Sequence, residues 1–146
     1  MRIAVLNGPS LNLLGSREPE LYGWETLADI EIRLDAVARE LGVEIEFAQH
    51  NGEGELIDRI HAYRGRVDGA LVNAGAYSHT SLALRDALVA VQVPYVEVHV
   101  TNVHAREAKR RKSMLAGKAI AVLAGFGAFG YELALRGIVA RLSARG

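Results

Sequence analysis

Short apolar runs alternate along the chain with longer amphipathic segments. The apolar runs are residues 3–6, 43–48, 69–72, 95–98 and 119–124. Each has the length of a strand, and runs of this kind are typical of strands that are buried on both faces. Strands that alternate with helices predict a parallel sheet with helices on both faces. Five such units in 146 residues predict a flavodoxin-like doubly wound five-stranded parallel sheet.

The segments between these runs carry apolar residues three or four positions apart, as amphipathic helices do. Thr26 opens the clearest one, Asp29 follows three residues later as in a capping box, and Gly42 ends it. Further helices are expected over residues 55–63, 81–91, about 105–112, and 128–143. No internal repeat is visible, and the length fits one domain over residues 1–146.

The charge balance argues against two classes of partner. Lys plus Arg number 17 and Asp plus Glu number 17, so we expect neither nucleic acid nor a membrane surface as a partner. The basic run at residues 109–112 is interpreted as a solvated helix face. The chain has no cysteine, which excludes disulfides, Cys-based zinc sites and thiol nucleophiles. No apolar stretch approaches the roughly 20 residues of a membrane span, and we expect a cytoplasmic protein.

Polar side chains concentrate where the predicted strands end. They are Asn7, Ser10, Arg17 and Tyr22 near the first strand, His50 and Asn51 near the second, Asn73 and His79 near the third, and Glu97, His99, Thr101, Asn102 and His104 near the fourth. Open parallel sheets bind ligands at the carboxyl ends of their strands, so a common pocket is predicted there. The alternative is that these loops are polar only because they are exposed. The histidine spacing gives no fixed metal geometry, so we expect a site without metal.

The first loop, residues 7–24, is long for a strand-to-helix connection, and long loops often act as lids. Arg17 and Tyr22 lie within it. A guanidinium beside a phenol favours the phenolate, and a phenolate can act as a general base. The alternative for Tyr22 is an aromatic side chain that only packs the lid closed.

Four motifs, in order, make the chain similar to the type II 3-dehydroquinate dehydratases, and the similarity covers essentially the whole sequence. They are NGPSLNLLGSREPELYG at residues 7–23, NAGAYSHTS at 73–81 with LRDA at 84–87, EVHVTNVHARE at 97–107 and GFGAFGY at 125–131. The resemblance implies a hydro-lyase of the shikimate pathway, which serves aromatic amino acid biosynthesis. Such an enzyme converts 3-dehydroquinate to 3-dehydroshikimate through an enolate and uses no cofactor.

The resemblance also implies catalytic roles. In this family a tyrosinate takes a proton from the carbon beside the substrate ketone, and a histidine protonates the departing hydroxyl. Tyr22 matches that tyrosine, with Arg17 matching the arginine beside it, and His99 matches the histidine. Glu97 lies two residues before His99 on the same strand face, so its carboxylate is expected to orient His99 and favour the protonated imidazole. The alternative for Glu97 is a salt bridge elsewhere in the strand layer.

Residues that hold the substrate in this family have counterparts here as well. The implied set is the backbone amides of Val100 and Thr101 and the Thr101 hydroxyl for the carboxylate, and Asn73, Gly75, His79 and Arg110 for the ring and its hydroxyls. Asp86 matches an aspartate that reaches into the site of a neighbouring subunit. The family forms homododecamers built as tetramers of trimers, and the same assembly is expected here. Arg106 matches an arginine near the lid, and its role is taken as structural.

Ser10 is the main departure from the family pattern, which has asparagine after Gly-Pro. That asparagine helps to hold a water or the developing enolate oxygen, and a serine hydroxyl cannot reproduce an amide. Lys109 and Met114 also stand where aromatic residues are usual, and Thr101 replaces the commoner serine. Two alternatives therefore stay open: a paralogue with weak or shifted activity, and a flavodoxin-like binding module without chemistry. The presence of both a base and an acid argues against the binding module.

Gly125, Gly127 and Gly130 form a G-x-G-x-x-G pattern between a predicted strand and a predicted helix. A dinucleotide fingerprint also needs a following strand with an acidic residue about 20 residues on, and no such strand follows here. These glycines are therefore interpreted as positions of close helix–sheet packing.

Overall fold

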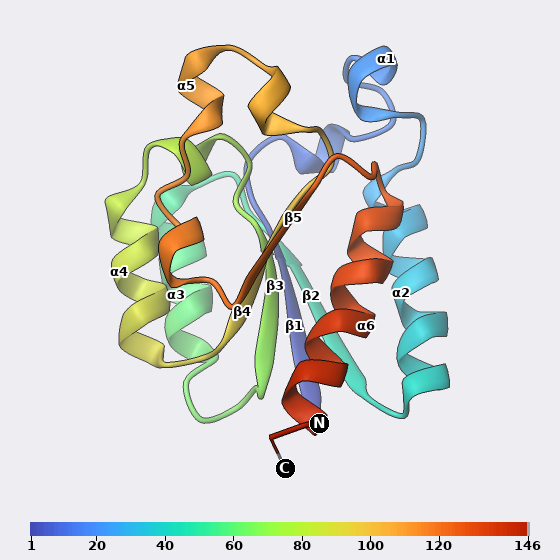
Figure 1. Ribbon diagram of the computed structural model, residues 1–146, viewed down its shortest axis with the longest axis vertical. Helices are drawn as coiled ribbons and strands as arrows, with labels where there is room; N and C mark the ends of the chain where they lie inside the picture. The colour runs from blue at the N-terminus through green and yellow to red at the C-terminus, as the bar shows by residue number, and fades with distance from the viewer. Residues whose placement is uncertain (146) are drawn as a thin grey trace.

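The sheet has five parallel strands in the order β2-β1-β3-β4-β5 (Figure 1). The computed structural model describes residues 1–145. Its strands are β1 (Arg2–Asn7), β2 (Glu44–Gln49), β3 (Gly69–Asn73), β4 (Tyr95–His99) and β5 (Ala121–Ala124). The winding reverses at β1, which lies between β2 and β3, as it does in flavodoxin-like folds. The predicted fold class is therefore confirmed.

Two pairs of helices cover the two faces of the sheet (Figure 1). α2 (Leu27–Leu41) and α6 (Phe129–Ser143) lie on one face, and α3 (Glu53–Ala62) and α4 (Leu82–Val91) lie on the other. In β1, Ile3 and Val5 pack into the core under α2 and α6. Their neighbours Ala4 and Leu6 pack into the core under α3 and α4. Because successive strand side chains point to opposite faces, a strand buried on both faces must be apolar at every position.

The predicted ends of α2 are confirmed. The Thr26 hydroxyl accepts a hydrogen bond from the Asp29 amide at 3.1 Å, and the Asp29 carboxylate accepts one from the Thr26 amide at 3.0 Å. Gly42 ends the helix with a φ of 69°, in the left-handed region that glycine adopts without strain. The cap at Thr26 fixes the direction in which the chain leaves the long first loop, and Gly42 turns it toward β2.

Two predicted elements differ from the observed ones. The helix expected over residues 105–112 is split into the 3₁₀ turn η3 (Val103–Ala105) and the short helix α5 (Ala108–Arg111). Arg106 between them is extended, with φ −100° and ψ −176°, so the helix cannot run through. The strand expected from residue 119 begins at Ala121, because the preceding residues form a 3₁₀ turn, η4 (Ala116–Lys118).

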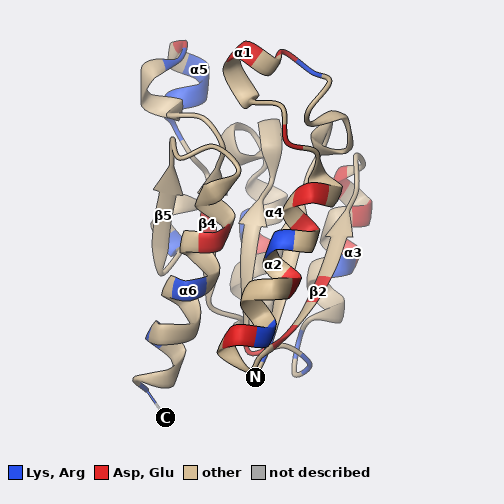
Figure 2. Ribbon diagram, turned by 90° about the vertical axis from the view of Figure 1, so that its right-hand side faces the viewer, with Lys and Arg blue, Asp and Glu red and all other residues tan. Residues whose placement is uncertain are grey.

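Loops and short helices gather above the carboxyl ends of the strands, at the top of Figure 1. They include η1 (Leu11–Leu13), α1 (Pro19–Tyr22), η2 (Gly75–His79), η3 and α5. Figure 2 shows that both α5, with its basic residues, and α1, with acidic ones, stand at this end of the molecule. Within residues 1–145, none of the helices has both the length and the apolar character to cross a membrane.

Candidate active site

A hollow of about 110 Å³ lies where β1, β3 and β4 end. It is lined by Pro9, Ser10, Leu11, Arg17, Tyr22, Asn73, Gly75, Ala76, His79, His99, Val100, Thr101, Val103, Arg106 and Arg110. Every site residue predicted from the sequence lines it except Glu97 and Asp86. A second hollow, of about 440 Å³, shares Tyr22, Val100, Thr101 and Arg106 with the first and extends along the lid to the turn after β5. Polar residues from three strand ends thus meet here as predicted, whereas Asn7, His50, Asn51, Asn102 and His104, which were expected in the same pocket, do not line this hollow.

The backbone around α1 places Tyr22 over the first hollow. Glu18 before the helix has a φ of 40°, Pro19 is its first residue, and Gly23 after it has a φ of 87°. A proline fits the first position of a helix because it lacks the amide hydrogen that would have no partner there. These turns hold the helix to four residues, and Tyr22 is the last of them. The tyrosine is half-buried although the helix itself is exposed.

Two guanidinium groups contact Tyr22. Nη1 of Arg106 donates a hydrogen bond to the Tyr22 hydroxyl at 3.0 Å, and the Arg106 Cζ lies 5.4 Å from the ring centroid. The Arg17 Cζ lies 4.9 Å from the same centroid. Arg17 was the arginine expected beside Tyr22, whereas Arg106 was expected to have only a structural role. The structure gives the direct contact with the hydroxyl to Arg106, and the split of the predicted helix at this residue lets its side chain reach the lid.

His99 and Glu97 form a buried pair at the end of β4. The His99 Nε2 lies 2.9 Å from the Glu97 Oε1, and Glu97 is fully buried. A carboxylate can only accept, so Nε2 carries the hydrogen and Nδ1 is the ring nitrogen that is left for a ligand. The Ser113 hydroxyl donates to the same Oε1 at 2.5 Å. The predicted orientation of His99 by Glu97 matches this geometry, whereas Ser113 was not anticipated.

His79 lies beside His99, with ring centroids 6.0 Å apart and an interplanar angle of 21°. The His79 Nδ1 is 2.8 Å from the backbone oxygen of Lys112. Because a carbonyl oxygen only accepts, Nδ1 of His79 must carry a hydrogen. The hydrogen bond of each ring to the protein therefore determines which nitrogen is left for a ligand.

The glycine-rich turn after β5 holds the end of β4. The Gly125 amide donates to the His99 carbonyl at 3.3 Å, and the Gly127 amide donates to the Val100 carbonyl at 3.0 Å. Both glycines have positive φ, 97° and 63°. A Cβ on Gly130 would lie 3.0 Å from a methyl carbon of Leu123, which agrees with the predicted close packing of α6 on the sheet. The turn supports the strand that carries His99, and its amides are occupied by protein carbonyls.

Asn73 belongs to a buried network that the sequence did not suggest. Its Nδ2 donates to the Tyr131 hydroxyl at 2.9 Å, and that hydroxyl donates to the Asn7 Oδ1 at 2.6 Å. The Asn73 Oδ1 accepts from the Gly75 amide at 3.2 Å. All three side chains are at most 4% exposed. Tyr131 thereby joins the last residues of β1 and β3 at the floor of the site.

Ser10 lines the hollow with its backbone in the left-handed region, at φ 68° and ψ −1°. Its amide donates to the Asn51 Oδ1 at 3.0 Å. Asparagine adopts this region several times more readily than most residues. An asparagine would therefore suit the backbone at this position better than serine does.

Two predicted binding residues have other contacts. Arg110 lines the hollow, but its Nε also donates to the Glu107 Oε1 at 2.6 Å. A hydrogen bond from its own backbone amide, followed by Arg110, lowers the pKa of the Glu107 carboxyl. Asp86 is exposed on α4 and does not line the hollow. The Asp86 side chain therefore lies on the outer surface of α4, away from this hollow.

The remaining polar residues at the strand ends contact the protein. The Asn102 Oδ1 accepts from the His104 amide at 3.2 Å and caps η3. The His50 Nδ1 lies 3.6 Å from the Glu55 carboxylate. Among residues 1–145 no group of three or more His, Cys, Asp or Glu side chains is arranged to hold a metal ion.

The sequence is similar to one family over nearly its full length. The family model for class II dehydroquinases matches residues 1–139. A 3-dehydroquinate dehydratase from Gemmatimonas aurantiaca is 60% identical over 142 residues, which are 97% of this chain and 93% of that protein. One from a Synechococcus strain is 56% identical over 142 residues, 97% of each chain.

Solved structures give the same result. A type II dehydroquinase from Butyrivibrio crossotus superposes with a TM-score of 0.92 at 37% identity, covering 96% of this chain and 97% of that one. The type II dehydroquinase from Propionibacterium acnes gives a TM-score of 0.91 at 40% identity, with 95% and 96% covered.

Proposed function

Because the chain belongs to the class II dehydroquinase family, we propose that it dehydrates 3-dehydroquinate with Tyr22 as the base and His99 as the acid. The chain is a 3-dehydroquinate dehydratase, a hydro-lyase of the shikimate pathway. The proposal concerns which side chain carries out each proton transfer. The observation that carries it is that Tyr22 and His99 line one hollow from different elements, the lid and the end of β4.

In the first step, the Tyr22 phenolate takes a proton from the carbon beside the ketone, and the electron pair moves onto the ketone oxygen as an enolate. The Arg106 hydrogen bond to the hydroxyl and the Arg17 guanidinium over the ring support this role. Two positive charges next to one phenol favour its anionic form. The same charges attract an anionic substrate to the opening.

In the second step, the enolate electrons expel the hydroxyl, which takes a proton from His99 and leaves as water. The support is the buried contact of His99 Nε2 with Glu97, since a carboxylate partner favours the imidazolium that can give a proton away. This contact leaves Nδ1 as the nitrogen that gives up the proton. To restore the starting state, Tyr22 releases to solvent the proton that it took from carbon, and His99 takes up one proton from solvent in place of the one it gave to the leaving hydroxyl. No cofactor takes part in this balance.

The substrate carboxylate is proposed to bind at Val100 and Thr101, which follow β4 directly and line the hollow. Backbone amides at a strand end can form an anion-binding concavity. Asn73, Gly75, His79 and Arg110 are proposed to hold the ring from the opposite wall. For Arg110 this requires the guanidinium to leave or share its contact with Glu107.

Ser10 is proposed to replace the family asparagine near the enolate oxygen. If the missing amide acts like a donor of an oxyanion hole, its loss costs roughly 10²-fold in rate. A paralogue with weak or shifted activity is therefore the second candidate function, and the serine is the specific observation that favours it.

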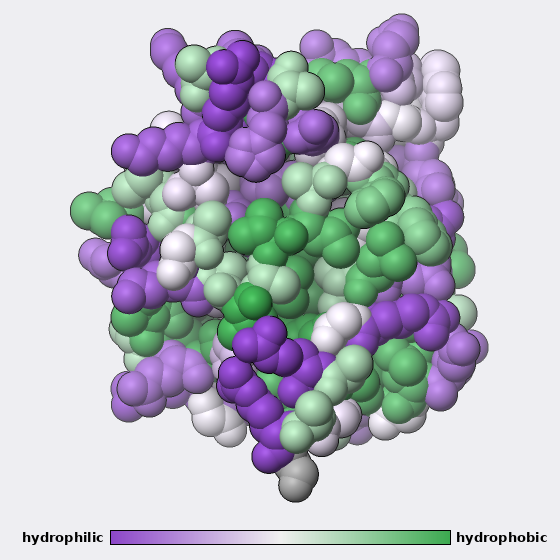
Figure 3. Space-filling view, in the orientation of Figure 1, coloured by the Kyte–Doolittle hydropathy of each residue, from purple (hydrophilic) through white to green (hydrophobic). Residues whose placement is uncertain are grey.

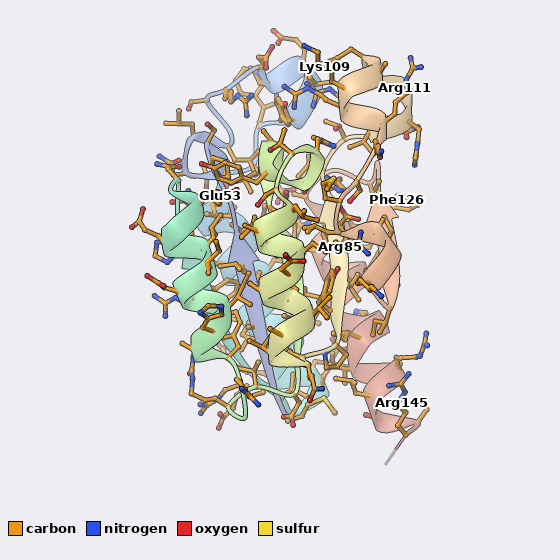
Figure 4. All side chains as sticks on the ribbon, turned by 90° about the vertical axis from the view of Figure 1, so that its left-hand side faces the viewer. Glu53, Arg85, Lys109, Arg111, Phe126 and Arg145 are labelled. Carbon is orange, nitrogen blue, oxygen red and sulfur yellow. The ribbon has the colours of Figure 1, made fainter. Side chains whose placement is uncertain are left out.

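We propose the homododecamer of the family as the assembly and the cytoplasm as the location. Support for assembly comes from exposed apolar side chains: Val122 on β5 is 48% exposed, Phe126 in the following turn is 62% exposed, and Phe129 at the start of α6 is 47% exposed. Figure 3 shows apolar residues in the middle of the face on which β5 lies, and Figure 4 shows Phe126 on the outside near α6. Exposed patches of this kind often mark interfaces. Measuring the mass of the protein in solution would test the homododecamer, and the mass of a monomer would show that this proposal is wrong.

The test of the mechanism uses the ultraviolet absorbance of the conjugated enone product. The Tyr22→Phe variant keeps the ring and its contacts with Arg17 but has no hydroxyl. Its kcat is expected to fall by about 10³-fold while the product still binds, measured by calorimetry. The His99→Asn variant should lose kcat to a similar degree. Near-normal turnover in either variant would remove that residue from its role.

A further inference from the structure

Ser113 lies in the segment between α5 and η4, and none of the proposed steps uses it. Its hydroxyl is within 2.5 Å of the Glu97 Oε1, although it comes from a different part of the chain. The Ser113 hydroxyl oxygen itself accepts hydrogen bonds from the Leu115 amide at 3.0 Å and from the Ala116 amide at 3.1 Å. Ser113 is partly buried and does not line the hollow.

These contacts fix the direction of the Ser113 hydrogen. A hydroxyl has one hydrogen and two acceptor lone pairs. The Leu115 and Ala116 amides occupy both lone pairs, so the hydrogen is left for Glu97. A hydroxyl polarised by two backbone amides is a better donor to a carboxylate, because hydrogen bonds in a chain strengthen one another. Ser113 therefore acts as a dedicated donor to Glu97.

Glu97 depends on this donor because it is cut off from water. It is fully buried, and both of its hydrogen bonds, from His99 and from Ser113, go to Oε1. The other carboxylate oxygen, Oε2, has no hydrogen-bond partner among residues 1–145. A buried carboxylate is stable as an anion only when partners compensate for the lost water. Without Ser113, the imidazole of His99 would be the only partner left.

The groups that face Glu97 from the neighbouring elements do not replace Ser113. In the sheet its partners are Val72 of β3 and Val122 of β5, which carry no charge. On β4, His99 is already bound and Tyr95 donates its hydroxyl to the Leu115 carbonyl. From η2, His79 stacks on His99 and donates to the Lys112 carbonyl.

The segment that carries Ser113 is held in place at several points. The Met114 amide donates to the Ser78 carbonyl at 2.7 Å, the Tyr95 hydroxyl holds the Leu115 carbonyl, and Leu115 itself is fully buried. The Ser113 hydroxyl is therefore presented to Glu97 in one position, as a positioning group requires.

We propose that Ser113 is a positioning residue for the acid step: its hydroxyl holds the Glu97 carboxylate so that Glu97 can orient His99. The inference rests on the proposed role of His99. It adds Ser113 to the pair formed by His99 and Glu97, at a position that does not line the hollow where the substrate would bind. Removing the hydroxyl should slow the proton transfer and leave substrate binding unchanged.

The test compares three variants by steady-state kinetics. Ser113→Ala removes the hydroxyl, Ser113→Thr keeps it, and Ser78→Ala is the matched control. The Ser78 hydroxyl is equally small and fully buried, but it has no hydrogen-bond partner within the described chain. Ser113→Ala is expected to lower kcat by about 10-fold or more with KM within about twofold, the usual effect of losing a hydrogen bond to a charged group. Ser113→Thr should recover most of kcat, and Ser78→Ala should match the parent.

A second readout does not depend on turnover. The imidazole N–H proton that His99 shares with Glu97 should give a resonance far downfield in proton NMR, assigned by its loss in His99→Asn. Its position should change in Ser113→Ala and return in Ser113→Thr.

The outcomes separate the two levels of the argument. An active His99→Asn enzyme would remove the acid assignment itself. If His99→Asn is inactive but Ser113→Ala keeps the parent kcat and the parent resonance, the role of Ser113 is wrong. A Ser113→Ala loss that appears in KM, or that Ser113→Thr does not rescue, would also overturn it.

Discussion

Two buried tyrosines should respond in opposite ways when their hydroxyls are removed. Tyr131 is 0% exposed and Tyr63 is 2% exposed. The Tyr131 hydroxyl bridges Asn73 and Asn7 at 2.9 and 2.6 Å. The Tyr63 hydroxyl has no hydrogen-bond partner among residues 1–145. Phenylalanine keeps the ring and its apolar contacts in both cases, so the difference between the variants isolates the hydrogen bonds.

The magnitudes follow from what each change leaves behind. Tyr131→Phe breaks two hydrogen bonds and leaves both asparagine groups unsatisfied in the core, which should destabilise the protein by about 2–4 kcal/mol. For a chain of this length that corresponds to a fall in Tm of roughly 10 °C. Tyr63→Phe removes a hydroxyl that was buried without compensation, so the free energy of unfolding should stay the same or rise by about 1 kcal/mol.

Urea denaturation followed by circular dichroism measures both effects as a shift in midpoint at constant slope. All samples should be compared at one protein concentration, because assembly would add to the apparent stability. Equal destabilisation of the two variants would refute the reasoning, since it would assign the effect to the ring environment. If the urea midpoint of Tyr131→Phe equals that of the parent, the Asn7–Tyr131–Asn73 network contributes no net stability.

Three further changes test the site and its surroundings. Ser10→Asn should raise the free energy of unfolding by about 0.5–1 kcal/mol, because asparagine tolerates a φ of 68° better, and should raise kcat; a lower value of both would contradict the account of Ser10. Arg106→Ala removes the donor to the Tyr22 hydroxyl and should lower kcat by roughly 10- to 100-fold, and a loss confined to KM would show that Arg106 only binds substrate. Burial, and then the charge of Glu97, raises the pKa of Tyr95 to about 12, above its ordinary value of 10.0. Because the pKa of Tyr95 is higher in the folded state, its contribution to stability is complete below pH 10 and is lost as the pH rises from 10 towards 12. Urea midpoints should therefore fall over this window in the parent and fall less in Tyr95→Phe.

The sequence predicted the parts of the fold that depend on local pattern. Burial of β1 on both faces produces an apolar run, and the Thr26–Asp29 box and Gly42 delimit α2 because caps involve residues a few positions apart. The helix predicted around residues 105–112 is present only as α5, Ala108–Arg111, and it is shorter than expected for a non-local reason. Nothing in its residue types shows that Arg106 is extended and reaches Tyr22, which lies 84 positions away in the chain.

In the candidate site, too, the sequence predicted some features, and contacts between residues distant in the chain escaped it. The rule that ligands bind at the carboxyl ends of strands was enough to group Tyr22, His99 and most of their neighbours in one hollow. The supporting contacts were not accessible to that rule. Tyr131 meets Asn7 across 124 positions, and Ser113 meets Glu97 across 16 positions and a break in secondary structure. No residue type or spacing in the sequence marks these pairs.

The two halves of the site are built on different kinds of support, and this difference has a mechanical consequence. The proposed acid, His99, belongs to the core: its side chain is 6% exposed and is connected through the fully buried Glu97 to Ser113. The proposed base, Tyr22, ends a four-residue helix that lies between two residues of positive φ. Arg106 and Arg17 contact it at the opening. Few buried contacts oppose a movement of α1, whereas any movement of His99 would disturb the sheet. Entry and exit of the ligand should therefore proceed by displacement of the lid that carries the base, with the acid held fixed.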